Sequence, residues 1–286
     1  MDRRNFAMTL AAALAGGASF EALAATPDWA AMERASGGRM GIAVLREGQP
    51  LQGHRLDERF AMCSTFKWLA AAHVLRRVDQ GQEQLERRVK YAEPLPSYSP
   101  ATKQHLADGM TVAELCKAAI TLSDNGAANL ILKTLGGPAG LTAFIRGVGD
   151  DVTRLDRWEP ELNEAAPGDP RDTSTPRSMA QLLRNVVLGD ALSPRSRAQL
   201  GQWLQATETN KKRLGAHKLA GWTLGSKTGT GERGSTNDVG IYWPAQGAPI
   251  VVAVFVTQTD APLAQREAAI AQVAAAVTSS DTRASK

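Results

Sequence analysis

Apolar residues recur at every third or fourth position through the middle of the chain, and this spacing predicts a series of amphipathic helices. Residues typical of helix starts support the prediction at two places. Thr111 lies three positions before Glu114, as in a capping box, and Pro176 follows Thr175. The predicted helices cover residues 64–78, 111–122, 124–135, 138–147, 176–188 and 194–205.

Towards both ends of the chain the pattern becomes typical of β-strands. Residues 39–62 read as strand, turn and strand around a polar turn at 47–50. A last helical segment covers 262–277. Three further strand-like segments lie between the helices and this last segment, at 222–231, 237–244 and 248–259.

Strands at both ends with helices between them predict a discontinuous α/β domain that carries an all-helical insert. The chain has 286 residues and is 43% hydrophobic, which is enough for one or two domains with a sizeable core. We expect the α/β domain to comprise residues 26–60 and 207–286, and the helical domain to comprise residues 61–206.

One long segment, residues 154–176, fits neither class of element. It is rich in proline and in charged residues, and its apolar positions show no period. A loop of this length in a compact domain is usually functional or disordered. The alternation of Arg and Asp favours an ordered Ω-type loop, with Arg157 paired to Asp172 across its neck, over a solvated charged loop.

The first 25 residues differ from the rest of the chain and resemble an export signal. A charged start precedes an apolar run that ends in small residues, with Ala22 and Ala24 in the A-x-A cleavage pattern. Arg3 and Arg4 are typical of the twin-arginine route, but Asp2 stands where Ser or Thr is usual, so the Sec route stays open. The alternative is a buried N-terminal helix. We expect residues 1–25 to be removed on export to the periplasm.

The charge of the chain excludes some classes of partner. Lys and Arg (33 residues) are interleaved with Asp and Glu (29 residues), and the net charge is +4. Because no basic stripe alternates with aromatic residues, we do not expect nucleic-acid binding. No later stretch has the roughly 18 consecutive apolar residues that a membrane span needs, so we expect no stable membrane association.

Ser64 lies three positions before Lys67 at the start of the first predicted helix, so the two side chains share one helix face. A serine hydroxyl needs a base to become a nucleophile, and a lysine among apolar neighbours has a lowered pKa that suits this role. The start of the helix would also favour a developing anion. The alternative is that the Lys67 amine reaches solvent along its aliphatic stem.

Two more segments place small polar residues at junctions between predicted elements. Residues 123–125 (SDN) lie between two helices, where the side chains could point into a cleft or simply cap the second helix. Residues 227–230 (KTGT) lie on a predicted strand, and a glycine there lets a ligand approach the backbone closely. The alternative for this segment is an ordinary edge strand that ends in a turn.

Together the three segments form the series S-x-x-K, S-D-N and K-T-G, which is the signature of class A β-lactamases and penicillin-binding proteins. From about residue 28 to residue 278 the chain resembles a class A serine β-lactamase, with similar motifs at RFAMCSTFK, YSPATK, LSDNGAANL, RLDRWEPELN and KTGTG. The resemblance implies an α/β plus all-α fold: an antiparallel sheet flanked by terminal helices, with a large inserted helical domain. It also implies a monomer without cofactor or metal.

The activity that the resemblance implies is hydrolysis of the β-lactam amide bond of penicillins and cephalosporins through a serine acyl-enzyme, which confers antibiotic resistance. Ser64 would be the acylated nucleophile, and Lys67 would move its proton. Ser123 would pass a proton to the β-lactam nitrogen. Glu159 and Asn163 would hold the water that hydrolyses the acyl-enzyme.

The resemblance implies the substrate-binding residues as well. Lys227 and Thr228 would bind the substrate carboxylate, and the backbone N–H groups of Ser64 and Thr230 would form the oxyanion hole. Arg213 would supply a guanidinium that some relatives place at position 236, where this chain has threonine. The full expected set is Tyr98, Asn125, Asn163, Arg213, Lys227, Thr228, Gly229 and Thr230.

The chain has two cysteines, Cys63 and Cys116. Their separation along the chain does not show whether they meet, although the helical spacing around Cys116 favours core packing. By resemblance, the usual disulfide partners would stand at the positions of Ala71 and Gly231. Both cysteines are therefore expected to be free thiols.

Four other functions compete with this interpretation. A penicillin-binding DD-peptidase shares the serine and lysine motifs but lacks the loop that carries Glu159, and a β-lactam sensor is acylated without fast turnover and is normally tethered to a membrane. A Ser–His–Asp hydrolase of the nucleophile-elbow type needs a G-x-S-x-G motif, which the chain lacks. A zinc enzyme needs clustered histidines, and the four histidines are scattered.

Overall fold

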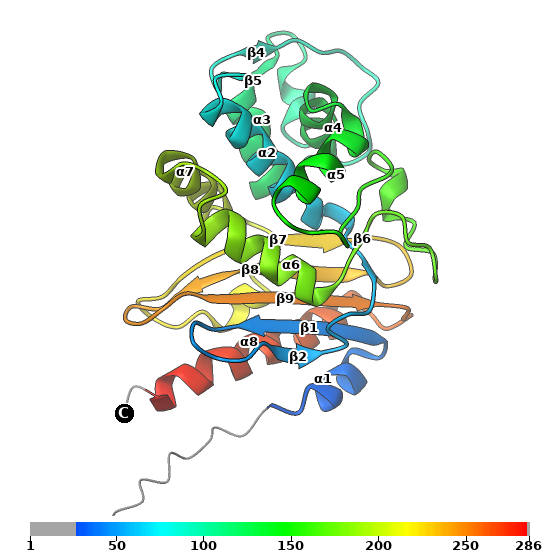
Figure 1. Ribbon diagram of the computed structural model, residues 1–286. Helices are drawn as coiled ribbons and strands as arrows, with labels where there is room; N and C mark the ends of the chain where they lie inside the picture. Colours follow the sequence, from blue (N-terminus) through cyan, green and yellow to red (C-terminus); the bar gives the residue numbers. More distant parts are fainter. Residues whose placement is uncertain (1–26, 285–286) are drawn as a thin grey trace, which may run out of the picture.

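The computed structural model describes residues 27–284. Its centre is a five-stranded antiparallel sheet in the order β2-β1-β9-β8-β7. The first and last parts of the chain therefore lie side by side, because β1 pairs with β9 (Figure 1). The strands are β1 (Arg39–Leu45), β2 (Gln52–His54), β7 (Thr223–Thr230), β8 (Thr236–Trp243) and β9 (Ile250–Thr257).

Both faces of this sheet are covered, which explains the unbroken apolar run of β9. Val252, Val254 and Val256 pack with the terminal helices α1 (Trp29–Ser36) and α8 (Leu263–Ala284) on one face. The alternate residues of the strand, such as Ala253 and Phe255, belong to the larger core on the other face. A strand buried on both faces needs apolar residues at every position, so period-two alternation is lost.

The larger core joins the sheet to the helices of the middle of the chain. Helix α6 lies across the sheet and contacts β1, β8 and β9, while α2 contacts each of α3, α4, α5 and α7 (Figure 1). Residues of α2 from Trp68 to Ala72 are fully buried, which makes this helix the centre of the helical part. The helices are α2 (Lys67–Asp79), α3 (Val112–Thr121), α4 (Asn125–Thr134), α5 (Gly137–Gly147), α6 (Pro176–Leu183) and α7 (Pro194–Gln205).

The predicted fold class, an antiparallel sheet with terminal helices and a large helical insert, is confirmed. The capping box is also confirmed, since the Thr111 hydroxyl accepts from the backbone of Glu114 and the Glu114 carboxylate accepts from the backbone of Thr111. The helix predicted at 176–188 continues beyond α6 as a π-helical segment, η4 (Arg184–Leu188). The helix predicted from residue 64 opens with a 3₁₀ turn, η1 (Cys63–Phe66).

Short elements that the apolar period did not indicate complete the fold. Three further 3₁₀ turns are η2 (Thr102–His105), η3 (Glu161–Asn163) and η5 (Leu214–His217). Two small two-stranded sheets pair β3 (Phe60–Ala61) with β6 (Thr173–Ser174), and β4 (Arg88–Val89) with β5 (Met110–Thr111). The β3–β6 pair ties the end of the long charged loop to the strand that leads into the predicted nucleophile turn.

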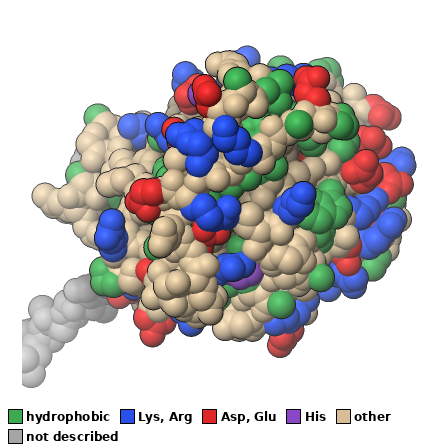
Figure 2. Space-filling view, turned by 90° about the horizontal axis from the view of Figure 1, so that it is seen from above, with side chains coloured by type: hydrophobic (Ala, Val, Ile, Leu, Met, Phe, Trp, Pro, Cys, Tyr) green, Lys and Arg blue, Asp and Glu red, His purple; other side chains and the backbone are tan. Residues whose placement is uncertain are grey.

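The surface over the helical part carries charged side chains of both signs, with Lys and Arg lying among Asp and Glu (Figure 2). Within residues 27–284, no helix combines the length and apolar character that a membrane crossing requires. The expected export signal at residues 1–25 lies outside the described residues.

Candidate active site

The turn that presents Ser64 is held from two sides. The Asn237 side-chain amide donates to the carbonyl oxygens of Ala61 and Met62, and the Met62 N–H donates to the Asp172 carbonyl oxygen. Cys63 has a φ of 46°, which is unfavourable for a residue with a side chain and persists only where the surroundings fix the backbone. These contacts place the Ser64 side chain at the start of the helix, where it lines a cleft.

Lys67 is fully buried and does not reach solvent, so the alternative of a solvent-exposed amine is excluded. Its Nζ lies 2.8 Å from the Ser123 carbonyl oxygen, 2.5 Å from Asn125 Oδ1 and 2.9 Å from Glu159 Oε1. Burial lowers the pKa of Lys67, while the charge of Glu159 and its hydrogen bond act in the opposite direction. A lysine with a lowered pKa, held by three acceptors, is suited to take up and release a proton.

Glu159 joins the charged loop to the nucleophile. Its Oε1 accepts from Ser64 Oγ at 3.2 Å, and its Oε2 accepts from Asn163 Nδ2 at 2.5 Å. The backbone of Glu159 is fixed to the helical part by Asn129, whose Nδ2 donates to the Glu159 carbonyl oxygen and whose Oδ1 accepts from the Glu159 N–H. The carboxylate is therefore positioned from both ends, with Ser64 on one side and Asn163 on the other.

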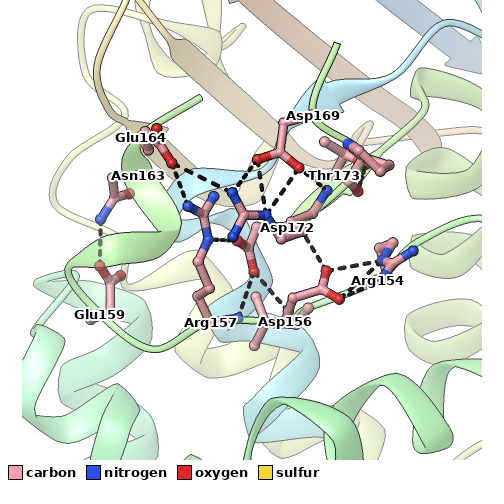
Figure 3. A network of polar contacts seen from close by, with 12 residues as sticks. Arg154, Asp156, Arg157, Glu159, Asn163, Glu164, Asp169, Asp172 and Thr173 are labelled. Carbon is pink, nitrogen blue, oxygen red and sulfur yellow. Dashed lines mark hydrogen bonds and ion pairs between the residues drawn. The ribbon is translucent and has the colours of Figure 1, made fainter. Parts of the chain in front are cut away.

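The loop at 154–176 is closed by a buried ion pair at its neck, as predicted (Figure 3). The Arg157 Nε donates to Asp172 Oδ2 at 2.6 Å, and the Asp172 Oδ1 accepts from the backbone N–H groups of Asp156 and Arg157. Arg157 also pairs with Glu164 at 2.5 Å. Asp172 is fully buried, so this single carboxylate satisfies donors that would otherwise have no partner.

Residues 123–125 both cap a helix and reach the cleft, so each of the two predicted alternatives is correct for a different residue. Asp124 is the N-cap of α4 and accepts from the Ala127 N–H. Ser123 adopts a φ of 61°, and its Oγ accepts from Lys227 Nζ at 3.0 Å. Asn125 accepts from Lys67 through its Oδ1 and donates to the Ser97 carbonyl oxygen through its Nδ2.

Strand β7 forms the opposite wall and lies at the edge of the sheet. Lys227 is fully buried on it, and burial together with the nearby charge of Lys67 lowers the pKa of Lys227 well below its ordinary value. Gly229 is required here because a Cβ at this position would lie 2.7 Å from the Met62 carbonyl oxygen. The strand can therefore approach the nucleophile turn closely.

Arg213 extends along the same strand from the loop before η5. Its Nη1 donates to the carbonyl oxygens of Gly229 and Asn237, its Nη2 donates to Thr230 Oγ1 at 2.9 Å, and its Nε lies 3.3 Å from Glu267 Oε1. Only 4% of the residue is exposed, yet it lines the cleft. These contacts fix one face of the guanidinium.

The predicted residues surround one cleft of about 320 Å³. Four further predicted residues do not line the cleft but contact side chains that do. They are Lys67, Glu159, Lys227 and Gly229. Within residues 27–284, no three His, Cys, Asp or Glu side chains are grouped so that they could hold a metal ion. The cleft is lined by Ser64, Tyr98, Ser123, Asn125, Asn163, Thr209, Arg213, Thr228 and Thr230.

Comparison with known proteins agrees with this arrangement. Residues 25–280 match the profile of the Beta-lactamase enzyme family. The ancestral (GNCA) class A β-lactamase is 59% identical, with 88% of this chain and 97% of that chain covered and a TM-score of 0.86. The putative class A β-lactamase PenP from Rhodopseudomonas palustris gives the same identity, coverage and TM-score. The chain belongs to the class A β-lactamase family.

Two side chains of this β-lactamase site were missed in the sequence analysis. Asn129 forms hydrogen bonds with both backbone groups of Glu159. It lies four residues after Asn125 on the same helix face, and this spacing could have indicated that Asn129 lies near the site. Thr209 lines the cleft, and its Oγ1 lies 2.6 Å from Thr228 Oγ1. It lies in a loop without periodicity, so only the folded chain brings it to the site.

Both cysteines of this β-lactamase are free, as predicted, and both are fully buried. Burial raises the pKa of Cys63 to about 12 and raises the pKa of Cys116 further. Because the thiolate is the reactive form, we expect Ellman's reagent to find two thiols in denatured, unreduced protein and almost none in native protein. Finding no thiol after denaturation would contradict the assignment.

Proposed function

We propose that this β-lactamase opens the β-lactam ring by acylation of Ser64 and regenerates the serine by hydrolysis that Glu159 assists. The observation that carries the proposal is the position of Glu159, buried on the closed loop and 3.2 Å from Ser64 Oγ. Hydrolysis of β-lactams is the activity of the family, and the steps below assign it to residues of this chain.

In the acylation step, Ser64 Oγ attacks the β-lactam carbonyl carbon and its proton moves to the neutral amine of Lys67. The oxyanion that forms is accepted by the backbone N–H groups of Ser64 and Thr230. The carbon–nitrogen bond of the ring then breaks, and Ser123 delivers a proton to the leaving nitrogen while it takes up the proton that Lys67 received from Ser64. The contacts from Lys67 and Lys227 to Ser123 support this route, since its Oγ lies 3.4 Å and 3.0 Å from their Nζ atoms.

In the deacylation step, Glu159 takes a proton from a water as the water attacks the ester carbonyl. The ester bond to Ser64 Oγ breaks, the serine recovers a proton, and the opened β-lactam leaves as an acid. Asn163 donates to Glu159 and lines the cleft, so its amide can help to position that water. A general base in the correct place accelerates such a step by about 10²–10⁴-fold.

The test of this proposal separates a hydrolase from a DD-peptidase or a sensor. Purified protein should hydrolyse a penicillin with many turnovers and should leave a D-alanyl-D-alanine peptide intact. Intact-protein mass spectrometry should detect an adduct only transiently, on the peptide that contains Ser64. A long-lived adduct with a single turnover would support a DD-peptidase or sensor, and turnover without any adduct would refute the serine mechanism.

We further propose that Arg213 and Lys227 bind the carboxylate of the substrate, because both cationic groups belong to the β7 side of the cleft. A charged hydrogen bond contributes about 1.5–3 kcal/mol, so Arg213→Ala should lower kcat/KM roughly tenfold or more. Arg195→Gln on α7 is the matched control for loss of one positive charge and should leave kcat/KM unchanged. An Arg213→Ala variant with the native Tm and unchanged kcat/KM would show that another residue supplies the charge.

Residues 1–25 are proposed to direct export to the periplasm, where a β-lactam-hydrolysing enzyme confers resistance. The pair Arg3 and Arg4 supports the twin-arginine route. Replacement of both by lysine should block processing of the precursor, and so should a host that lacks the twin-arginine translocase. Normal processing in that host would assign the Sec route instead.

We infer that the protein acts as a monomer, because every residue of the proposed mechanism comes from one chain and surrounds one cleft. Light scattering coupled to size-exclusion chromatography should give a mass near that of one mature chain at all concentrations tested. A specific activity that rises with protein concentration would contradict this inference.

A further inference from the structure

A second cavity lies against the same loop but shares no lining residue with the catalytic cleft. Its volume is about 400 Å³, and we call it the loop cavity. One wall is the later half of the loop, residues 165–169 with Arg171. The other wall is formed by Arg39, Glu58 and Arg59 near the start of the sheet and by Thr257 and Gln258 at the end of β9.

Four arginines and two carboxylates line the loop cavity. Three of these arginines are paired with carboxylates: Arg39 with Glu58, Arg157 with Asp172 and Glu164, and Arg171 with Asp169. Arg59 donates to two uncharged acceptors, the Val152 carbonyl oxygen and Thr173 Oγ1, each at 3.0 Å. Neither acceptor neutralises the guanidinium, so part of the charge of Arg59 remains available to a ligand.

Arg39 lies beside Arg59 but is held by its own partners. Its Nη1 pairs with Glu58 at 2.9 Å, its Nη2 donates to the Arg59 carbonyl oxygen at 2.7 Å, and its Cζ lies 4.1 Å from the centroid of the Phe60 ring. Its Nε has no acceptor within the part of the chain that the structure describes, but it is closed off from the cavity. A ligand in the loop cavity would therefore meet Arg59 and not the Nε of Arg39.

The loop wall leaves room for such a ligand. Between Glu164 and Asp169 the loop consists of small residues, Ala165, Ala166, Pro167 and Gly168, whose side chains do not fill the space. The two carboxylates that flank these small residues are themselves paired, Glu164 with Arg157 at 2.5 Å and Asp169 with Arg171 at 2.6 Å (Figure 3). The cavity is therefore larger than one water molecule needs and is bordered by guanidinium groups on both walls.

We propose that the loop cavity binds a small oxyanion, either a polycarboxylate or a phosphate, mainly through Arg59. A guanidinium group recognises carboxylate and phosphate oxygens through paired hydrogen bonds, and Arg171 lies on the opposite wall. The bound oxyanion connects the later half of the loop to the sheet. Because the earlier half carries Glu159, occupancy of the loop cavity stabilises the closed loop from the side away from the substrate.

The experiment measures the Tm of the full mature protein in citrate, in inorganic phosphate and in chloride at equal ionic strength. A ligand at about ten times its Kd should raise the Tm by about 3–5 °C. Citrate acting without phosphate would identify the carboxylate as the ligand, and the reverse would identify the phosphate. Hydrogen exchange should show added protection at residues 165–171.

Variants separate the loop cavity from the catalytic cleft, which is itself cationic. Arg59→Gln and Arg171→Gln should each lose most of the Tm increase. Arg195→Gln, the matched loss of charge on α7, should retain it, and so should Arg213→Ala, which removes a cationic group from the catalytic cleft. An increase that survives in Arg59→Gln and Arg171→Gln, or that is lost in Arg213→Ala, would overturn the proposal, as would no increase with either oxyanion. None of these measurements depends on β-lactam turnover.

Discussion

Replacement of Glu159 by alanine is expected to leave acylation by a penicillin largely intact and to slow deacylation by about 10²–10⁴-fold. In the proposed mechanism the two steps differ because each has its own base. Lys67 is the proposed base of the first step, and the neighbouring Glu159 carboxylate raises its pKa against the effect of burial. Without that carboxylate the pKa of Lys67 falls further, so the neutral amine becomes more abundant.

The lower pKa of Lys67 in Glu159→Ala should also change how the acylation rate depends on pH. The base form of Lys67 is the deprotonated form, and its population increases as pH rises through the pKa. Lowering the pKa of Lys67 should therefore move the acidic limb of the acylation rate to lower pH in Glu159→Ala. Single-turnover kinetics across pH would measure this shift, while mass spectrometry follows the long-lived adduct.

Two controls make the Glu159 result specific. Ser64→Ala in the Glu159→Ala background should give no adduct, because the nucleophile is absent. Glu161→Ala removes a carboxylate two residues away, from the exposed side of the loop, and should leave deacylation unchanged. Near-native turnover of Glu159→Ala would refute the role of Glu159, and an adduct on another residue would refute the role of Ser64.

The second large effect is expected from Asp172→Asn at the neck of the loop. The carboxylate is buried, pairs with Arg157 and accepts from two backbone N–H groups. Loss of one partner of a buried ion pair costs about 3–5 kcal/mol, and the remaining Arg157–Glu164 pair places this site near the lower value. A loss of about 3 kcal/mol should lower the Tm by roughly 6–12 °C.

The matched control for this change is Asp57→Asn, which removes an exposed carboxylate paired with Arg177 at 2.7 Å. Exposed ion pairs contribute about 0–1 kcal/mol, so its Tm should stay close to the native value. Asp172→Asn should also deacylate more slowly than native protein, because the loop positions Glu159. Equal Tm values for the two variants would show that the neck ion pair does not close the loop.

The predictable parts of this fold are those set by local patterns. The period of apolar residues indicated the positions of α2 to α7, although α2 is buried on every side from Trp68 to Ala72. The motifs around Ser64, Ser123 and Lys227 indicated the cleft. The pairs β3–β6 and β4–β5 could not be predicted, because strands of two residues depend on tertiary contacts and leave no period. The contact of Asn129 with Glu159 joins residues 30 positions apart in the chain, and local reasoning does not detect such pairs.

The cleft lies where the sheet and the helices meet, so the site is complete only when both parts of the chain have folded. Ser64, Lys67 and Asn125 belong to the helical part, while Lys227, Thr230 and Arg213 belong to the sheet side. In the proposed mechanism, neither half holds both the nucleophile and the site for the substrate carboxylate. Strands β1 and β9 also pair residues from opposite ends of the chain. A partly synthesised chain therefore contains no working catalyst, and hydrolysis can begin only after the last strand has been released from the ribosome and inserted between β1 and β8.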